Sequence, residues 1–378
     1  SSRADLITNL AILASEHGKV SRARGFYLQA LELEPQSFVP AYNLARFFFL
    51  KGELERARAV AAQALDRAPQ AREGYQLLEQ IESGAGDSEA ALAVIRRWRE
   101  RHPNDVAAQI AQCRWHAYLD QGEALAELLP ALVSRCPGHP DLLALLAGLP
   151  VITRALQGLT PALAACFDPH RQVQHHPSLL DPSLCERLQA LILADPTLHD
   201  QRPHKPTRQG SQTHELFSEP LAEPLAALAS ILRPRINAMI EGLDLEQRRA
   251  LAYPNDSDDL GFSGWGVVLD RGGYQAPHGH PDSLFSGVVY LQVPEQESVP
   301  GQRHAPGSLC FYGDGVRQEG TPDGAASAHE AATLSILPCR GDLILFPSYL
   351  WHGTVPFYAA GPRICLAFNV VPRSAADR

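Results

Sequence analysis

The sequence predicts a two-domain α+β protein, with an all-α repeat array in its first half and a β-rich domain in its second. Prolines recur every 34 residues over the first part, and after Tyr253 short β-prone runs alternate with glycine and proline. A length of 378 residues suits two domains of roughly 100–200 residues each. We therefore divide the chain into repeats at 1–138, a helical connector at 139–167 and a second domain at 168–378.

The repeat has a period of 34 residues at three kinds of position. The prolines are Pro35, Pro69, Pro103 and Pro137, the glycines are Gly18, Gly52 and Gly86, and the alanines are Ala23, Ala57 and Ala91. Each glycine is expected in a tight turn between two helices, where the backbone needs either a positive φ or a close approach. Each alanine lets the paired helices approach, and each proline ends the second helix of its unit.

This spacing resembles the tetratricopeptide repeat over about residues 4 to 138, in four units. The fourth unit is degenerate, because Asp120 and Leu125 replace the glycine and the alanine. The resemblance implies a helical solenoid whose concave surface binds a partner protein or peptide. The alternative is a structural spacer or a dimerisation arm.

Composition limits the partners and the compartment. The formal net charge of −9 argues against nucleic acid or an anionic membrane as the main partner. The seven cysteines are widely spaced and form no C-x-x-C pair, so a reducing compartment is expected. The apolar run Leu142–Ile152 is far shorter than the roughly 20 residues that span a bilayer. The start of the chain lacks a signal-peptide pattern, and we expect a cytoplasmic protein.

Helices are expected on both sides of a long polar segment in the second domain. The connector reads as apolar helices over Asp141–Leu163, and further helices are expected at Leu180–Asp195 and Leu221–Leu243. Asp181 can cap the first of these two flanking helices. Asp200–Phe217 is rich in His, Arg, Lys and Gln, and we interpret it as a long loop.

Short β runs fill the rest of the second domain. They are Trp265–Leu269, Phe285–Val293, Ser308–Tyr312, Asp342–Phe346 and Arg363–Val371. Many short strands separated by turn residues are typical of a sandwich or a barrel.

Two histidine clusters lie among these strands. The first is segment 278–282, which reads H-G-H-P-D, and the second is His352, which follows a strong β run. Residues two apart on a strand share a face, so His278 and His280 can reach one ion, and so can His280 and Asp282. Two ligands close in sequence and one distant histidine are the parts of a facial metal site with open positions, as in non-haem Fe(II) oxygenases.

Arg363 opens the last strand, eleven residues after His352. Its guanidinium fork is suited to bind a carboxylate through two hydrogen bonds. Arg363, Cys365, Ala367 and Asn369 share one face of this strand, whereas the other face is apolar. Such alternation is expected for a barrel wall that surrounds a ligand.

These motifs together resemble the 2-oxoglutarate/Fe(II)-dependent oxygenases, in particular a bacterial and phage branch with an H-x-H-P-x-S…S-G-x-x-Y core. The matching stretches are Trp265…Gly272-Gly273-Tyr274…His278-Gly279-His280-Pro281, Ser286-Gly287-Val288-Val289-Tyr290-Leu291, Gly341-Asp342-Leu343-Ile344-Leu345-Phe346-Pro347-Ser348…His352 and Arg363…Phe368-Asn369. The resemblance covers about residues 168 to 378, most closely 261 to 371.

The resemblance implies a double-stranded β-helix, also called a jelly roll, with flanking helices. It also implies that His278 and His352 bind Fe(II) and that Arg363 binds the C5 carboxylate of 2-oxoglutarate. O₂ would then oxidise this cosubstrate to succinate and CO₂ while a substrate side chain is hydroxylated. No further catalytic residue is expected beyond the metal site.

The sequence departs from the broad superfamily in two places. The usual H-x-D reads H-x-H at His278 and His280, so we predict the ligands His278, His280 and His352, with Asp282 as the alternative carboxylate. The usual R-x-S ends in a cysteine, whose thiol is a weaker hydrogen-bond partner than a hydroxyl. The predicted cosubstrate residues are Arg363, Cys365, Asn369 and Tyr290.

The sequence supports one leading hypothesis and two alternatives. The leading one is an Fe(II)- and 2-oxoglutarate-dependent dioxygenase that hydroxylates a protein or peptide recruited by the repeats, with loops Pro294–Gly307 and Asp314–Ala332 at the mouth of the site. The second is a non-catalytic scaffold with an inactive barrel. The third is a three-histidine, cupin-type metal dioxygenase that does not use 2-oxoglutarate.

Overall fold

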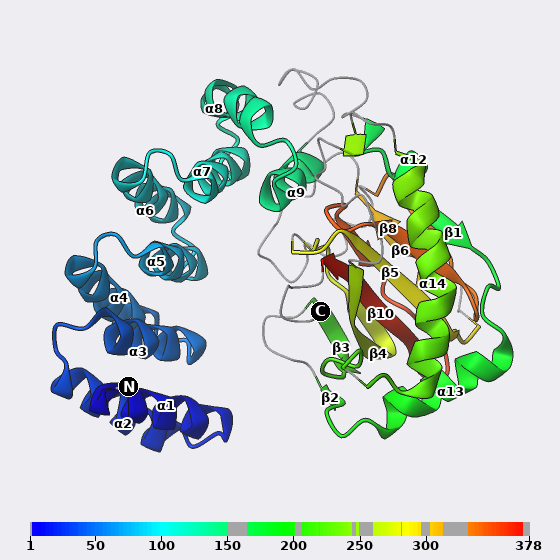
Figure 1. Ribbon diagram of the computed structural model, residues 1–378, viewed down its shortest axis with the longest axis horizontal. Helices are drawn as coiled ribbons and strands as arrows, with labels where there is room; N and C mark the ends of the chain where they lie inside the picture. Colours follow the sequence, from blue (N-terminus) through cyan, green and yellow to red (C-terminus); the bar gives the residue numbers. More distant parts are fainter. Residues whose placement is uncertain are drawn as a thin grey trace. The chain divides into compact units, whose positions relative to one another are not determined.

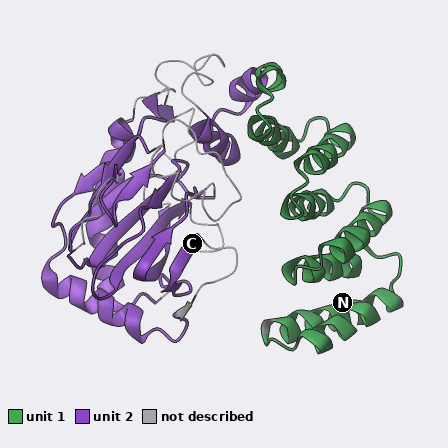
Figure 2. Ribbon diagram, turned by 180° about the vertical axis from the view of Figure 1, so that it is seen from behind, with its two compact units in different colours: residues 1–128 green, residues 129–378 purple. Residues whose placement is uncertain are grey.

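The computed structural model describes residues 2–149, 165–200, 206–218, 220–243, 247–248, 260–280, 282–295, 303–312 and 332–372. The chain forms two compact units, residues 1–128 and residues 129–378, shown in different colours in Figure 2. The division falls inside helix α8, the second helix of the fourth repeat.

The first unit is a series of antiparallel helix pairs (Figure 1). Its helices are α1 (Arg3–Glu16), α2 (Val20–Leu33), α3 (Phe38–Leu50), α4 (Leu54–Arg67), α5 (Arg72–Gly84), α6 (Ser88–Arg101), α7 (Val106–Tyr118) and the start of α8 (Gly122–Arg135). Each predicted 34-residue repeat therefore corresponds to one helix pair. The repeat alanines Ala23, Ala57 and Ala91 are fully buried between the paired helices.

The turn inside each pair has one residue with a positive φ. Gly18, Gly52 and Gly86 have φ values of 69°, 74° and 79°, and Asp120 has a φ of 56° at the same position of the fourth repeat. Aspartate tolerates this left-handed conformation better than most residues with a side chain. The fourth repeat therefore keeps the turn although it has lost the glycine.

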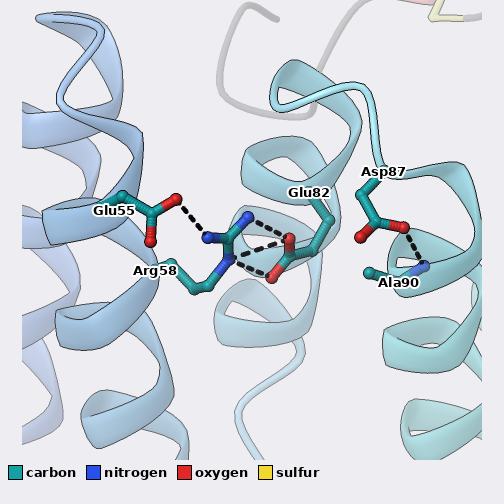
Figure 3. Close-up of polar contacts among 5 residues, drawn as sticks. All are labelled: Glu55, Arg58, Glu82, Asp87 and Ala90. Atoms are coloured by element: carbon teal, nitrogen blue, oxygen red, sulfur yellow. Dashed lines mark hydrogen bonds and ion pairs between the residues drawn. The ribbon is translucent and has the colours of Figure 1, made fainter.

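Charged side chains connect successive pairs of the first unit. Figure 3 shows Arg58 of α4 between two carboxylates, with its Nε and Nη2 bonded to Glu82 of α5 at 2.8–3.0 Å and its Nη1 bonded to Glu55 at 2.7 Å. These bonds, that to Glu82 first, raise the pKa of the Arg58 guanidinium above its ordinary value. Asp87, in the same view, caps α6 by accepting from the Ala90 backbone N–H at 2.9 Å.

The second unit contains a seven-stranded and a three-stranded antiparallel sheet, with the orders β1-β8-β5-β10-β4-β3-β2 and β7-β6-β9. The strands are β1 (Gln174–His176), β2 (His199–Asp200), β3 (Thr207–Gln212), β4 (Leu260–Gln275), β5 (Phe285–Gln292), β6 (Leu309–Phe311), β7 (Leu334–Ile336), β8 (Leu343–Pro347), β9 (His352–Thr354) and β10 (Arg363–Pro372). This combination with the helical repeats confirms the predicted α+β class.

From β4 onwards the chain passes back and forth between the two sheets. After β4 in the large sheet, His278 forms an antiparallel bridge with β9 of the small sheet, and β5 then returns to the large sheet. Further along, β8 and β10 belong to the large sheet and β9 to the small one. A double-stranded β-helix has this alternation, and the jelly roll itself stays a prediction.

Two helices cover the outer face of the large sheet (Figure 1). They are α13 (Pro182–Ala194), capped by Asp181 as predicted, and α14 (Glu223–Glu241). A Cβ on Gly266 of β4 would lie 2.4 Å from Ile192 of α13, so glycine is what permits this close approach. The opposite face of the sheet is thereby left to form the interior of the domain.

The predicted long loop Asp200–Phe217 contains a strand in its described part, and residues 201–205 lie outside the described residues. Thr207–Gln212 is strand β3, which pairs with β4 across a register shift next to Gly210. A Cβ on Gly210 would lie 2.5 Å from the Val268 carbonyl oxygen, so the two backbones meet more closely than a side chain allows. The strand forms because the long strand β4 offers hydrogen-bond partners, although the local residue types do not favour it.

The connector contains helix α9 (Pro140–Gly148) and a short stretch at residues 165–167 before α12 (Pro169–Gln172). The rest of the predicted helical stretch, residues 150–164, lies outside the described residues. Within the described part of the chain, no helix combines the length and the apolar character that crossing a membrane requires.

Candidate metal centre

His278 and His352 are joined through their backbones. The His278 N–H donates to the His352 carbonyl oxygen at 2.9 Å, and the His352 N–H donates to the His278 carbonyl oxygen at 2.9 Å. His352 begins β9, and His278 follows the end of β4. This reciprocal pair places the two imidazole rings with their centroids 4.3 Å apart.

The hydrogen bonds of these two rings fix their tautomers. His278 Nδ1 lies 2.8 Å from the Ala276 carbonyl oxygen, and His352 Nδ1 lies 3.0 Å from the Leu350 carbonyl oxygen. A carbonyl oxygen can only accept, so each Nδ1 carries the proton when the ring is neutral. Each Nε2 then has a lone pair, which is the form in which imidazole binds a metal ion.

His280 completes a group of three imidazoles. Its ring centroid lies 4.8 Å from that of His278 and 5.2 Å from that of His352. One ring nitrogen from each of the three histidines lies within 4.8 Å of the others. The His280 N–H donates to the Ser348 carbonyl oxygen at 2.9 Å, which ties its backbone to the segment that precedes β9. The donor set suits a divalent transition metal bound by imidazole.

Aromatic side chains from both sheets surround the histidines. Phe346 of β8 lies 4.6 Å from the His352 ring, Phe311 of β6 lies 4.9 Å from Phe346, and Trp265 of β4 lies 5.9 Å from the His280 ring. His352 is buried, and this burial lowers its pKa well below the ordinary value, helped by the charges of His278 and His280. A neutral ring is the form needed by a metal ligand.

Asp282, the alternative ligand, is not part of the group of three histidines. It lies in a turn after the second of them, and its side chain is exposed. Its neighbour Pro281 lies outside the described residues. The structure thus brings His278, His280 and His352 together and leaves Asp282 apart from them.

Arg363 is one of the largest fully buried side chains of the protein. Its Nη1 donates to the Gly307 carbonyl oxygen at 2.6 Å, and its Nη2 lies 3.4 Å from the Tyr290 hydroxyl oxygen. Its Nε is buried without a hydrogen-bond partner, and no described carboxylate forms an ion pair with it. A buried cation without a counter-charge is costly, so this arrangement favours an anionic ligand at the guanidinium.

Tyr290 and Cys365 stand opposite each other on β5 and β10 beside this guanidinium. The Arg363 Cζ atom lies 5.0 Å from the centroid of the Tyr290 ring. Burial raises the pKa of the Tyr290 hydroxyl and of the Cys365 thiol, although Arg363 acts in the opposite direction on both. Both groups therefore stay protonated and uncharged at neutral pH, and neither would repel an anion bound by Arg363.

The predicted residue Asn369 belongs to a buried polar group at the other end of β10. Its Oδ1 accepts a hydrogen bond from Ser286 Oγ at 2.8 Å, and Ser286 Oγ also lies 2.8 Å from Ser348 Oγ. Because the Ser286 proton is given to Asn369, Ser348 is the donor to Ser286. The sequence motif includes Ser348, but its contact with Ser286 was not predicted, since its side chain follows β8 and only the sheet register brings it to β5.

The histidines and Arg363 lie on the same face of the large sheet. Ala367, four residues after Arg363, pairs with Trp265, whose ring contacts His280. Alternation along β10 puts Arg363 and Ala367 on one face, and directly paired residues share that face. Of the two loops expected at the mouth of the site, residues 296–302 and 313–331 lie outside the described residues.

Two segments of the chain match known families. Residues 263–369 match the family model described as "Putative 2OG-Fe(II) oxygenase", and residues 14–81 match a tetratricopeptide repeat model. The chain contains a 2OG-Fe(II) oxygenase domain and tetratricopeptide repeats. Both predicted resemblances are thereby confirmed. All three histidines and Arg363 lie within the oxygenase match.

Several solved structures match the chain at low TM-scores. A prolyl-4-hydroxylase from Pseudomonas putida is 16% identical with a TM-score of 0.36, covering 56% of this chain and 98% of its own. YrrB, a tetratricopeptide protein with an unusual peptide-binding site, is 22% identical with a TM-score of 0.31, covering 39% and 75%. A thermophilic tetratricopeptide protein from Thermus thermophilus is 21% identical with a TM-score of 0.30, covering 38% and 79%.

Because these TM-scores are all below 0.5, the structural likenesses do not bear on function. No curated protein is significantly similar to the chain.

Proposed function

We propose that the protein is an Fe(II)- and 2-oxoglutarate-dependent dioxygenase that hydroxylates a side chain of a protein or peptide. The observation that carries this proposal is the pairing of two features on one face of the large sheet. One is the group of three histidines, and the other is the buried guanidinium of Arg363 without a carboxylate partner among the described residues. An oxygenase of this kind needs a metal site and an anchor for a dicarboxylate.

His278, His280 and His352 would hold the metal. The fit rests on two observations. The His278 and His352 rings donate through Nδ1 and so keep a lone pair on Nε2, and the His280 ring lies close to both. Bound Fe(II) would supply the O₂ chemistry, with coordination positions left open for the cosubstrate. Phe346, Phe311 and Trp265 would limit the access of water to this centre.

Arg363 would bind the distal carboxylate of 2-oxoglutarate with its unpartnered Nε and its Nη2. The Tyr290 hydroxyl and the neutral Cys365 thiol would donate weaker hydrogen bonds to the same carboxylate. Asn369, at the far end of β10, would donate a hydrogen bond to 2-oxoglutarate. Its amide nitrogen would be the donor, because its amide oxygen already accepts from Ser286. These groups would orient the cosubstrate, and we expect no catalytic residue beyond the metal ligands.

The substrate class follows from the repeats. Tetratricopeptide repeats form extended concave surfaces that bind peptides and proteins, and this chain carries them in the same polypeptide as the oxygenase domain. We therefore propose that the repeats recruit the protein or peptide that is hydroxylated. Covalent linkage raises the effective concentration of a captured segment near the oxygenase domain.

A second candidate function is favoured by the nature of the donor set. The described group contains three histidines and no carboxylate, which also suits a cupin-type metal dioxygenase that does not use 2-oxoglutarate. Such an enzyme would bind metal but would have no use for a buried anion anchor. A scaffold with an inactive barrel would have a use for neither feature.

Calorimetric titration of 2-oxoglutarate into anaerobic, Fe(II)-loaded protein tests the proposal. We expect binding by the wild type and by Arg340→Ala, an exposed arginine of the same unit, and loss of binding in His352→Ala and Arg363→Ala. In a separate assay with O₂ present, the wild type should slowly convert 2-oxoglutarate to succinate and CO₂ in a reaction that needs Fe(II). Iron binding without 2-oxoglutarate binding would favour the cupin-type enzyme, and binding of neither would favour the scaffold.

A further inference from the structure

Two of the three histidines depend on one short loop. Residues Ser348–Trp351, here named the ligand loop, connect β8 to β9. The Ser348 carbonyl oxygen accepts from the His280 backbone N–H at 2.9 Å, and the Leu350 carbonyl oxygen lies 3.0 Å from His352 Nδ1. A displacement of this loop would therefore move His280 and rotate the His352 ring. The three histidines therefore keep a fixed geometry only if the ligand loop keeps its position.

The connector contacts the ligand loop through an indole. Trp351 Nε1 donates to the Ala144 carbonyl oxygen of α9 at 3.1 Å. A Cβ on Gly148, one turn later in α9, would lie 3.2 Å from the same nitrogen. Glycine at that position thus lets the indole lie directly against the helix backbone. Trp351 immediately precedes His352, so this contact acts one residue from a predicted ligand.

A second contact is formed by Tyr349. Its hydroxyl donates to the Cys166 carbonyl oxygen at 3.0 Å, and its ring lies 5.4 Å from that of Phe167. Cys166 and Phe167 are fully buried, and Tyr349 is buried as well. Positions 349 and 351 of the ligand loop are therefore bound by two separate parts of the connector.

The strands of the second unit hold the same loop as well. Ser348 Oγ bonds to Ser286 of β5, and the Trp351 carbonyl oxygen accepts from the Tyr312 N–H at 3.0 Å. Leu350, between the two anchored aromatic residues, is buried and carries the carbonyl that orients His352. The loop is thus fixed between the strands on one side and the connector on the other.

We propose that Trp351 and Tyr349 are positioning residues through which the connector sets the geometry of the metal centre. This inference rests on the proposed binding of metal by the three histidines, and it does not depend on 2-oxoglutarate. It gives the connector a function beyond linking the repeats to the oxygenase domain. Removing either contact leaves the ligands in place and loosens the carbonyls that orient them.

Co(II) binding to the full-length protein tests this inference, with affinity and visible absorption as the readouts. Trp351→Phe removes the N–H donor and keeps an aromatic ring, and Tyr349→Phe removes only the hydroxyl. We expect each variant to bind Co(II) about tenfold more weakly, the lower end of the range for groups that orient metal ligands. We also expect the d–d absorption of the Co(II)-saturated variants to differ from that of the wild type.

Trp98→Phe is the matched control. Trp98 is a buried indole of α6 in the first unit, and its Nε1 has no hydrogen-bond partner. This variant loses the same atoms and should keep the wild-type Co(II) affinity and spectrum. If Trp351→Phe does not fold, Gly148→Ala displaces the indole while leaving it intact, and it should change the spectrum in the same direction.

The outcomes separate the two proposals. Wild-type affinity and an unaltered Co(II) spectrum in the folded Trp351, Tyr349 and Gly148 variants would overturn the positioning role and leave the metal site standing. Failure of the wild type to bind Co(II) at all would contradict the metal site itself, and the positioning role would fall with it.

Discussion

His278 and His352 exchange two backbone hydrogen bonds of 2.9 Å, although 73 residues lie between them in the sequence. In an antiparallel ladder such a reciprocal pair fixes the relative position of the two residues without any help from their side chains. When one of the two histidines is replaced, the backbone pair therefore still holds the other imidazole in its place. Substitution of a single ligand then reports on metal binding rather than on the fold.

His278→Ala, His280→Ala and His352→Ala should each lower metal affinity by more than about 100-fold, beyond the usual effect of losing an outer-shell partner. Asp282→Asn should leave metal affinity unchanged, because Asp282 lies outside the histidine group with an exposed side chain. Calorimetry with Co(II) or anaerobic Fe(II) measures all four. A large loss in Asp282→Asn, with little loss in His280→Ala, would make the aspartate the third ligand.

Arg363→Met should have opposite consequences with and without the cosubstrate. In its absence, stability should change little or rise, because a buried cation without a described carboxylate partner is replaced by an apolar side chain of similar length. In the wild type, 2-oxoglutarate at 100 times its Kd should add about 2.7 kcal/mol to the free energy of unfolding, and Arg363→Met should lack this gain. Urea unfolding of the metal-loaded proteins measures both.

Severe destabilisation of ligand-free Arg363→Met would instead show that the guanidinium is mainly structural, held by its bonds to Gly307 and Tyr290. Arg340→Met serves as the control, since the Arg340 side chain is exposed on the same unit.

The sequence predicted the elements whose signal is local. The 34-residue period gave the helix pairs, and the alternation of Arg363, Cys365 and Asn369 gave the face of β10 that lines the interior. Strand β3 was not predicted, because its residues are polar and it is formed by pairing with β4. The contact between Trp351 and Ala144 was equally invisible, since nothing local in either segment specifies a partner 207 residues away.

Asp120→Gly should stabilise the first unit. Asp120 has a φ of 56°, and left-handed backbone costs a residue with a Cβ roughly 1–2 kcal/mol, less for aspartate than for most residues. Part of that gain is lost because glycine is more flexible in the unfolded chain, so we expect a net increase of about 0.5 kcal/mol.

Thermal unfolding followed by circular dichroism measures this change. Gly86→Ala is the matched comparison at the same position of the third repeat, where φ is 79° and open space surrounds the site of the missing Cβ. It should destabilise by about 1 kcal/mol for backbone reasons alone. If Asp120→Gly destabilised the protein, the aspartate side chain would have to supply a turn contact that outweighs the backbone strain.

His176 should make stability fall in mild acid. Its pKa is lowered from the ordinary 6.5 by burial first, and then by the charges of Arg235 from α14 and of its neighbour His175. The folded protein therefore binds this proton less readily than the unfolded chain. The stabilising contribution is complete above pH 6.5 and is lost as the pH falls from there towards the folded pKa.

Urea midpoints of the metal-free protein between about pH 5 and 7.5, the range in which histidine titrates, check this sign. His304 and His352 act in the same direction, so the wild-type slope is a sum, and the difference from His176→Gln isolates one residue. His176→Gln should lose less stability on acidification than the wild type. An equal slope in His176→Gln would mean that the His176 ring, whose buried Nε2 lacks a hydrogen-bond partner, takes up its proton in the folded state without cost.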